Sequence, residues 1–86
     1  MPRVNEFFGI IIAMYYNDHA PPHFHAIYGE HEAKLRNDTF EILEGYLPRR
    51  TLKLVREWAG LHRKELAANW NRARHGEPLK PIKPLQ

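Results

Sequence analysis

A double proline, Pro21-Pro22, most strongly constrains what this sequence can fold into. Each proline fixes its backbone φ angle and removes an amide donor, so this part of the chain is not helical. The residues that follow, His23–Tyr28, alternate at period two and are rich in residues that favour strands. We therefore predict a rigid, extended corner at Pro21-Pro22 that joins two strands, the second of them over residues 23–28.

Three histidines and an aspartate surround this corner, namely Asp18, His19, His23 and His25. Residues two apart in a strand point to the same face, so we expect His23 and His25 side by side, with Cα atoms roughly 6–7 Å apart. His19, on the near side of the corner, is expected to fold back toward them. Asp18 is expected to hydrogen-bond one ring and fix its orientation.

The sequence leaves open what this cluster does. In the simplest interpretation, the histidines are ordinary polar residues on a half-exposed strand. In a catalytic hypothesis, His23 and His25 form an acid–base pair oriented by Asp18 in a small hydrolase or nuclease, with Arg36 or Arg56 steadying a phosphate.

In a metal hypothesis, His19, His23 and His25 bind a divalent transition metal. A closed zinc site needs four ligands, and the sequence has no cysteine to supply the fourth. The three histidines therefore argue against a closed zinc site and leave an open three-histidine site or a weak, adventitious one as the alternatives. No other cofactor is expected.

The length of 86 residues predicts one small domain over residues 1–76, followed by an extended, proline-rich tail at 77–86. A chain of this size buries only roughly 60–65% of its unfolded surface, so a homodimer would add stability.

The lack of cysteine in the sequence fits a reducing cytoplasm. The apolar stretch Phe7–Tyr16 is too short to span a membrane and lacks a cleavage site, so we expect a soluble cytoplasmic protein.

Three further strands complete the predicted sheet. The run Phe7–Tyr16 is apolar on both faces and is typical of a central strand. The segment His31–Asn37 alternates, with Ala33 and Leu35 expected to face inward. The segment Phe40–Gly45 is short, and we interpret it as a strand because Gly45 and the proline that follows leave no room for a helix.

One long helix is predicted from Pro48 or Arg49 to about His75, where Gly76 ends it. Gly60 is a position where this helix would bend or divide. Its apolar stripe, with Trp58 at the edge, is expected to pack on the sheet and consists of Leu52, Val55, Ala59, His62, Leu66, Trp70 and Ala73. The fold class is therefore α+β, with a three- to four-stranded antiparallel sheet and one long C-terminal helix on a face.

The charge is distributed unevenly along the chain. Residues 1–47 hold three Lys/Arg against seven Asp/Glu, a net charge of −4, whereas residues 48–86 hold ten against three, a net charge of +7. Either the two halves neutralise each other or the basic half meets a charged partner, such as RNA or DNA. The candidate contacts on the outer face of the helix are Lys53, Arg56, Arg63, Lys64 and Arg74. Leu54 and Leu61 lie on another side and are candidate contacts to a second subunit or protein partner.

Three segments together resemble a family of small bacterial proteins known as domain of unknown function 4160. They are the corner Asp18–His25 with its His-x-Pro-Pro-His-x-His signature, the helix segment Arg56–Trp70, and the terminal Ile82–Leu85. The resemblance implies a single α+β domain of bacterial origin. It also implies a gene neighbour from another small family, in a pairing like that of toxins and antitoxins.

These features lead to an interaction module of a two-gene, toxin–antitoxin-like system as the first functional hypothesis. Its partner would be a small protein, with nucleic acid as a further target. The His-based hydrolase or nuclease and the metal-binding protein are the alternatives. The resemblance implies no catalytic assignment.

Overall fold

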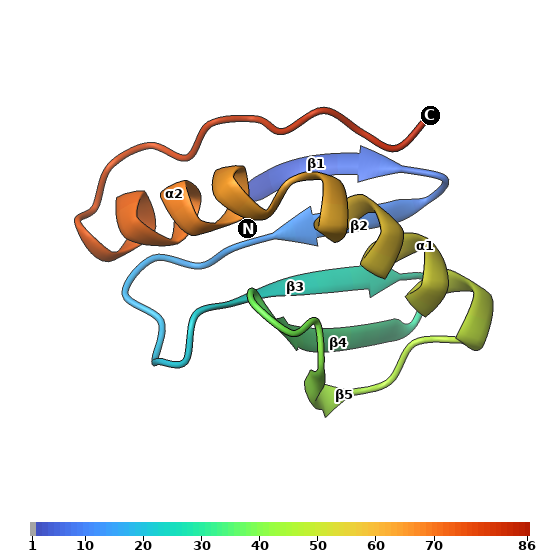
Figure 1. Ribbon diagram of the computed structural model, residues 1–86. Helices are drawn as coiled ribbons and strands as arrows, with labels where there is room; N and C mark the ends of the chain where they lie inside the picture. The colour runs from blue at the N-terminus through green and yellow to red at the C-terminus, as the bar shows by residue number, and fades with distance from the viewer. Residues whose placement is uncertain (1) are drawn as a thin grey trace.

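The chain forms a five-stranded antiparallel sheet with two helices in front of one face (Figure 1). The computed structural model describes residues 2–86, so residue 1, where the predicted domain begins, lies outside it. The strands follow one another across the sheet as a meander: β1 (Arg3–Phe7), β2 (Ile10–Ala13), β3 (His23–Tyr28), β4 (His31–Arg36) and β5 (Ile42–Gly45). The predicted α+β class is confirmed, whereas the expected three to four strands and single helix are wrong.

The first hairpin corrects the prediction of one strand over Phe7–Tyr16. Phe8 and Gly9 have φ angles of 49° and 76°, and two consecutive positive φ values are typical of the tight turns that join antiparallel strands. The apolar run therefore folds back on itself, with Phe7 paired to Ile10. The glycine within the apolar run was the sequence sign of this turn.

The remaining strands agree more closely with the sequence. Strand β3 has the predicted bounds, β4 ends one residue earlier than expected, and β5 is a shortened form of the predicted strand over residues 40–45. Ala33 and Leu35 are buried as expected, whereas Glu32 is exposed. The alternation places Phe24 and Ala26 beneath the helices, so His25 and Ile27 point to the opposite face of the sheet.

The predicted single helix is two helices, α1 (Arg49–Leu61) and α2 (Arg63–Arg74), which divide at His62. His62 has φ −130° and ψ 31°, outside the helical region. Its ring nitrogen Nδ1 lies 2.6 Å from Oε1 of Glu65 in the first turn of α2, so it tethers the start of that helix. The sequence had indicated Gly60 as the position of a bend, yet Gly60 lies within α1.

Trp58 is the centre of the core between the helices and the sheet. Its side chain is fully buried and its ring centroid lies 5.7 Å from that of Phe7 and 6.0 Å from that of Phe24. The predicted apolar stripe supplies most of the buried helix residues, namely Val55, Ala59, Leu66, Trp70 and Ala73. Through Trp58, α1 therefore packs against both β1 and β3.

The C-terminal segment after α2 is extended and lies against the body (Figure 1). The buried amide of Asn69 donates to the carbonyl of Lys80 at 2.8 Å and accepts from its N–H at 2.9 Å. The Trp58 indole N–H donates to the carbonyl of Lys83 at 2.8 Å. Ile82 is buried, and Leu79 and Leu85, three residues to either side, pack against the same core.

Candidate metal centre

Asp18 is positioned by the loop between β2 and β3. The backbone N–H of His19 donates to its Oδ1 at 2.8 Å, which leaves Oδ2 directed at the start of β3. Oδ2 lies 2.8 Å from Nε2 of His23 and 3.5 Å from Nε2 of His25. One carboxylate oxygen therefore faces both histidines of the strand.

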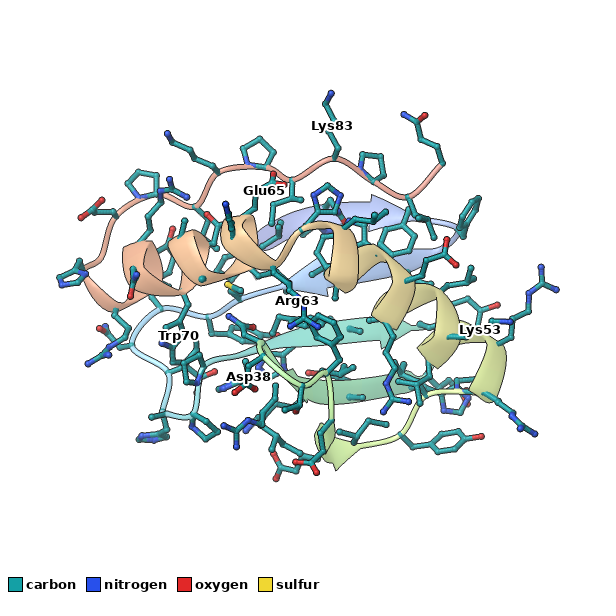
Figure 2. The ribbon with its side chains drawn as sticks, in the orientation of Figure 1. Asp38, Lys53, Arg63, Glu65, Trp70 and Lys83 are labelled. Atoms are coloured by element: carbon teal, nitrogen blue, oxygen red, sulfur yellow. The ribbon has the colours of Figure 1, made fainter. Side chains whose placement is uncertain are left out.

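The His23 ring is held on both of its nitrogens. Nδ1 lies 2.8 Å from the carbonyl oxygen of Pro21, and Nε2 lies 2.8 Å from Asp18 Oδ2. A carbonyl only accepts hydrogen bonds, so Nδ1 carries a proton. Nε2 donates to Asp18 when it is protonated, and it offers a lone pair on the same side when it is not. The ring is only 2% exposed and its centroid lies 5.1 Å from that of Trp70 on α2. In Figure 2, Trp70 points from α2 toward this corner.

The His25 ring is also held through Nδ1, so its Nε2 is on the side of Asp18. Its Nδ1 lies 3.1 Å from Oε2 of Glu32, while its buried Nε2 has no hydrogen-bond partner among the described residues. The ring meets Tyr15 edge-on, with centroids 4.6 Å apart. A carboxylate on Nδ1 holds the proton there, so Nε2 offers a free lone pair.

Three potential ligand atoms thus converge at the corner. One ligand atom from each of His23, His25 and Asp18 lies within 4.8 Å of the other two, and Nε2 of both rings lies near Asp18 Oδ2. Zinc bonds to nitrogen and oxygen are about 2.0–2.2 Å long, so a tetrahedral ion holds its ligand atoms roughly 3.3–3.6 Å apart. Small side-chain movements of about 1 Å would bring the three atoms to that spacing.

The electrostatics favour a charged carboxylate beside a neutral phenol. Partial burial raises the pKa of Asp18, but the hydrogen bonds from the His19 N–H and the His23 ring outweigh it, so the pKa lies below its ordinary value. Burial, followed by the Glu32 and Asp18 carboxylates, raises the pKa of Tyr15. Asp18 is therefore ionised at neutral pH and available as a ligand, whereas Tyr15 keeps its proton.

Other residues considered from the sequence lie outside this centre. His19 is exposed and does not belong to the converging group, although its N–H positions Asp18. Arg36 is engaged by Asp38 through two contacts of 2.8 and 3.2 Å, and Arg36 in turn lowers the pKa of Asp38. The five candidate nucleic-acid contacts are all exposed on the helices, namely Lys53, Arg56, Arg63, Lys64 and Arg74.

Glu32 is the site residue that sequence reasoning missed. It pairs with Ile27 in the ladder between β3 and β4, which sets its side chain on the same face as His25. The turn at Gly29-Glu30 contains the signal. A two-residue connection there fixes the register and brings Glu32 diagonally across from His25.

Comparison with known proteins places the chain in a family. A family model described as Domain of unknown function (DUF4160) matches residues 9–71, so the chain belongs to that family and the resemblance noted in the sequence is confirmed. The match contains the histidine corner and most of both helices. No curated protein and no solved structure matches the chain. Within residues 2–86, no helix has the length and apolar character needed to cross a membrane.

Proposed function

We propose that this protein binds a divalent transition-metal ion through Asp18, His23 and His25. The observation that carries the proposal is the convergence of one ligand atom each from Asp18, His23 and His25, all within 4.8 Å of one another. The proposal replaces His19 of the sequence hypothesis with Asp18. It retains the open site, because three protein ligands leave a position for water or another ligand.

The surroundings of the two rings support a metal ligand role. Histidine ligands of metals commonly donate their other N–H to a carbonyl or carboxylate, which fixes the ring and raises its basicity. His23 does so to Pro21 and His25 to Glu32. A metal ion would also satisfy the buried Nε2 of His25, which has no other partner among the described residues.

The chemistry of the ligand set indicates the class of ion. Two imidazoles with one carboxylate suit zinc and other first-row divalent ions better than magnesium or calcium, which prefer oxygen ligands. Bound there, such an ion would act as a Lewis acid on whatever occupies its open position. The near-complete burial of His23 favours a ligand role over proton transfer to a substrate.

The test is zinc titration by calorimetry of protein purified without a histidine tag. We expect one zinc per chain for the natural sequence, and at least a tenfold loss of affinity in both Asp18→Asn and His25→Ala. At free zinc of about 100 times Kd, the natural protein should gain about 2.7 kcal/mol of stability, measured by urea unfolding.

Two single-histidine variants serve as matched controls. His19→Ala removes the neighbouring histidine that lies outside the converging group, and His31→Ala removes an exposed one on β4. Both should bind zinc within about twofold of the natural protein. Zinc binding that survives Asp18→Asn and His25→Ala, or that is lost in His19→Ala, would show that these three residues are not the ligand set.

The association with a small protein partner or a second copy remains a prediction. Of the two residues considered for it, Leu61 is 68% exposed, whereas Leu54 packs partly against the core. Leu61 is therefore the one more available to a partner.

A further inference from the structure

Four basic residues form a row along the outer side of the helices. Arg49, Lys53 and Arg56 follow one another at spacings of four and three residues, and Arg63 comes seven residues later. Within α1 these spacings place Arg49, Lys53 and Arg56 on one side of the helix, over about 10 Å, and Arg63 begins α2. All four side chains are exposed, and we call them the cation row.

The cation row continues across the break between α1 and α2, because Arg56 of α1 and Arg63 of α2 both contact Phe40. Nε of Arg56 donates to the carbonyl of Phe40 at 3.1 Å, and the guanidinium of Arg63 lies 4.4 Å from the centre of the Phe40 ring. A Cβ placed on Gly60 would lie 4.0 Å from that ring. Gly60 therefore faces the same ring.

The acidic half of the chain does not neutralise the cation row. Among residues 2–86, the ion pairs made by Lys or Arg join residues before α1: Arg3–Glu6, Lys34–Glu44 and Arg36–Asp38. Where the row meets the β4–β5 connection, Arg56 and Arg63 donate to the carbonyls of Phe40 and Asp38, which carry no net charge. Figure 2 shows Arg63 above Asp38, with Lys53 to the right on α1.

We propose that the cation row binds the phosphate backbone of a nucleic acid. Arginine presents a fork of donors that fits phosphate oxygens, and the row offers three arginines and a lysine in line. The carbonyl contacts hold Arg56 and Arg63 in place, so less side-chain freedom is lost on binding.

The same surface indicates binding that does not depend on base sequence. The large exposed aromatic side chains are Phe8, Tyr16, Tyr28 and Tyr46. None of them lines the hollow formed by Arg49, Lys53 and Arg56. Without an aromatic platform, the row contacts phosphates rather than stacked bases. Affinity should then come from charge and fall steeply with salt.

Fluorescence anisotropy with labelled 30-mers of double-stranded DNA, double-stranded RNA and single-stranded RNA tests this proposal and distinguishes the type of nucleic acid. We expect Kd values of roughly 1–100 µM near physiological salt for at least one of them. Arg49→Gln combined with Lys53→Gln should weaken that binding roughly tenfold. On duplex DNA it should also reduce the slope of log K against log salt by about 1.8, or about 0.9 for each lost contact.

The matched control is Arg3→Gln combined with Lys34→Gln, which removes the same charge from the ion-paired cations of the sheet. Its affinity should stay within about twofold of the natural protein. An equal loss in both double variants would overturn the proposal, because only net charge would then matter. So would the absence of saturable binding to all three 30-mers at low salt, or equally tight binding of poly-glutamate, which would indicate an acidic polypeptide as the partner.

Discussion

Among single residues, Gly45 at the end of β5 is the most constrained by its surroundings. Its φ is +87°, and a Cβ there would overlap the carbonyl oxygen of Glu32 on the neighbouring strand. An alanine would bear the cost of left-handed backbone, about 1–2 kcal/mol, and that of overpacking, about 1–3 kcal/mol. We expect Gly45→Ala to lower the free energy of unfolding by about 2–5 kcal/mol in urea denaturation.

Gly29 provides the control for this substitution. It also has a positive φ, of +58°, but a Cβ there would meet nothing within 4 Å. Gly29→Ala should therefore cost only the backbone part, about 1–2 kcal/mol. Equal losses in the two variants would show that β4 moves aside to make room for the new methyl group.

Only part of the candidate metal centre could be predicted from the sequence. Period-two spacing was enough to predict that His23 and His25 share a face, and their ring centroids lie 5.3 Å apart. Asp18 was expected beside one ring, but spacing could not show that it lies near both while His19 stays outside, because a loop has no periodicity. Glu32 belongs to another strand and required the register of the β3–β4 hairpin.

At the level of elements, strands bounded by strong turn signals were predictable. The turn at Phe8-Gly9 and the helix break at His62 were not located from the sequence. The segment His23–Tyr28 follows a double proline and precedes a glycine, so both of its ends were marked. Gly9 was the one sign of the first hairpin, because Phe8 adopts a positive φ that its residue type does not favour and the flanking residues form one apolar run. The helix break at His62 depends on a ring contact to Glu65 that periodicity does not encode.

The two helices differ in how their end charges suit the helix dipole. The first turn of α1 holds Arg49 and Arg50 and no acidic residue, and Pro48 supplies no side-chain cap. Cations at a helix N-terminus are unfavourable, so Arg50→Glu should raise the free energy of unfolding by about 0.3–1 kcal/mol at low salt. Urea unfolding at two salt concentrations measures the effect, which should shrink as salt rises.

The same change of charge at the C-terminal end of α2 should change the free energy of unfolding in the opposite direction. Arg74 lies in the last turn of α2, where a cation is favourable. Arg74→Glu should therefore lower the free energy of unfolding by about 0.3–1 kcal/mol. If both variants shift stability in the same direction, net charge rather than the helix dipole dominates.

On the scale of the whole molecule, the charge asymmetry of the sequence becomes an asymmetry between two layers. The sequence allowed the acidic and basic halves to neutralise each other, but the Lys and Arg ion pairs within residues 2–86 all lie in the sheet half. The basic layer is left with Arg50 at an unfavourable helix end, at a cost in stability. An uncompensated charge of this kind is consistent with a negatively charged partner for that layer.

The two ends of the chain hold each other in place. The N–H of Ile82 donates to the carbonyl of Val4 at 3.2 Å, and the amide of Asn5 donates to the carbonyl of Ile82 at 3.1 Å. Val4, Asn5 and Ile82 all lie outside the family match at residues 9–71. In this chain, the extended C-terminal segment therefore completes the core and shields the outer edge of β1.

Ile82 should consequently be a major determinant of stability although it lies in a segment without helix or strand. Ile82→Ala should lower the free energy of unfolding by about 2–5 kcal/mol, the range for truncating a buried isoleucine. Lys83→Ala is the control, because its side chain is exposed and only its carbonyl contacts Trp58. It should change stability by no more than about 0.5 kcal/mol.

Tryptophan fluorescence distinguishes a weakened core from a detached segment. Trp58 is fully buried and its indole N–H is satisfied by the carbonyl of Lys83. If the segment detaches, that donor meets water, and emission should shift to longer wavelength below the unfolding transition in Ile82→Ala but not in Lys83→Ala. Stability and emission that stay at their natural values in Ile82→Ala would mean that residues 77–86 do not hold the fold together.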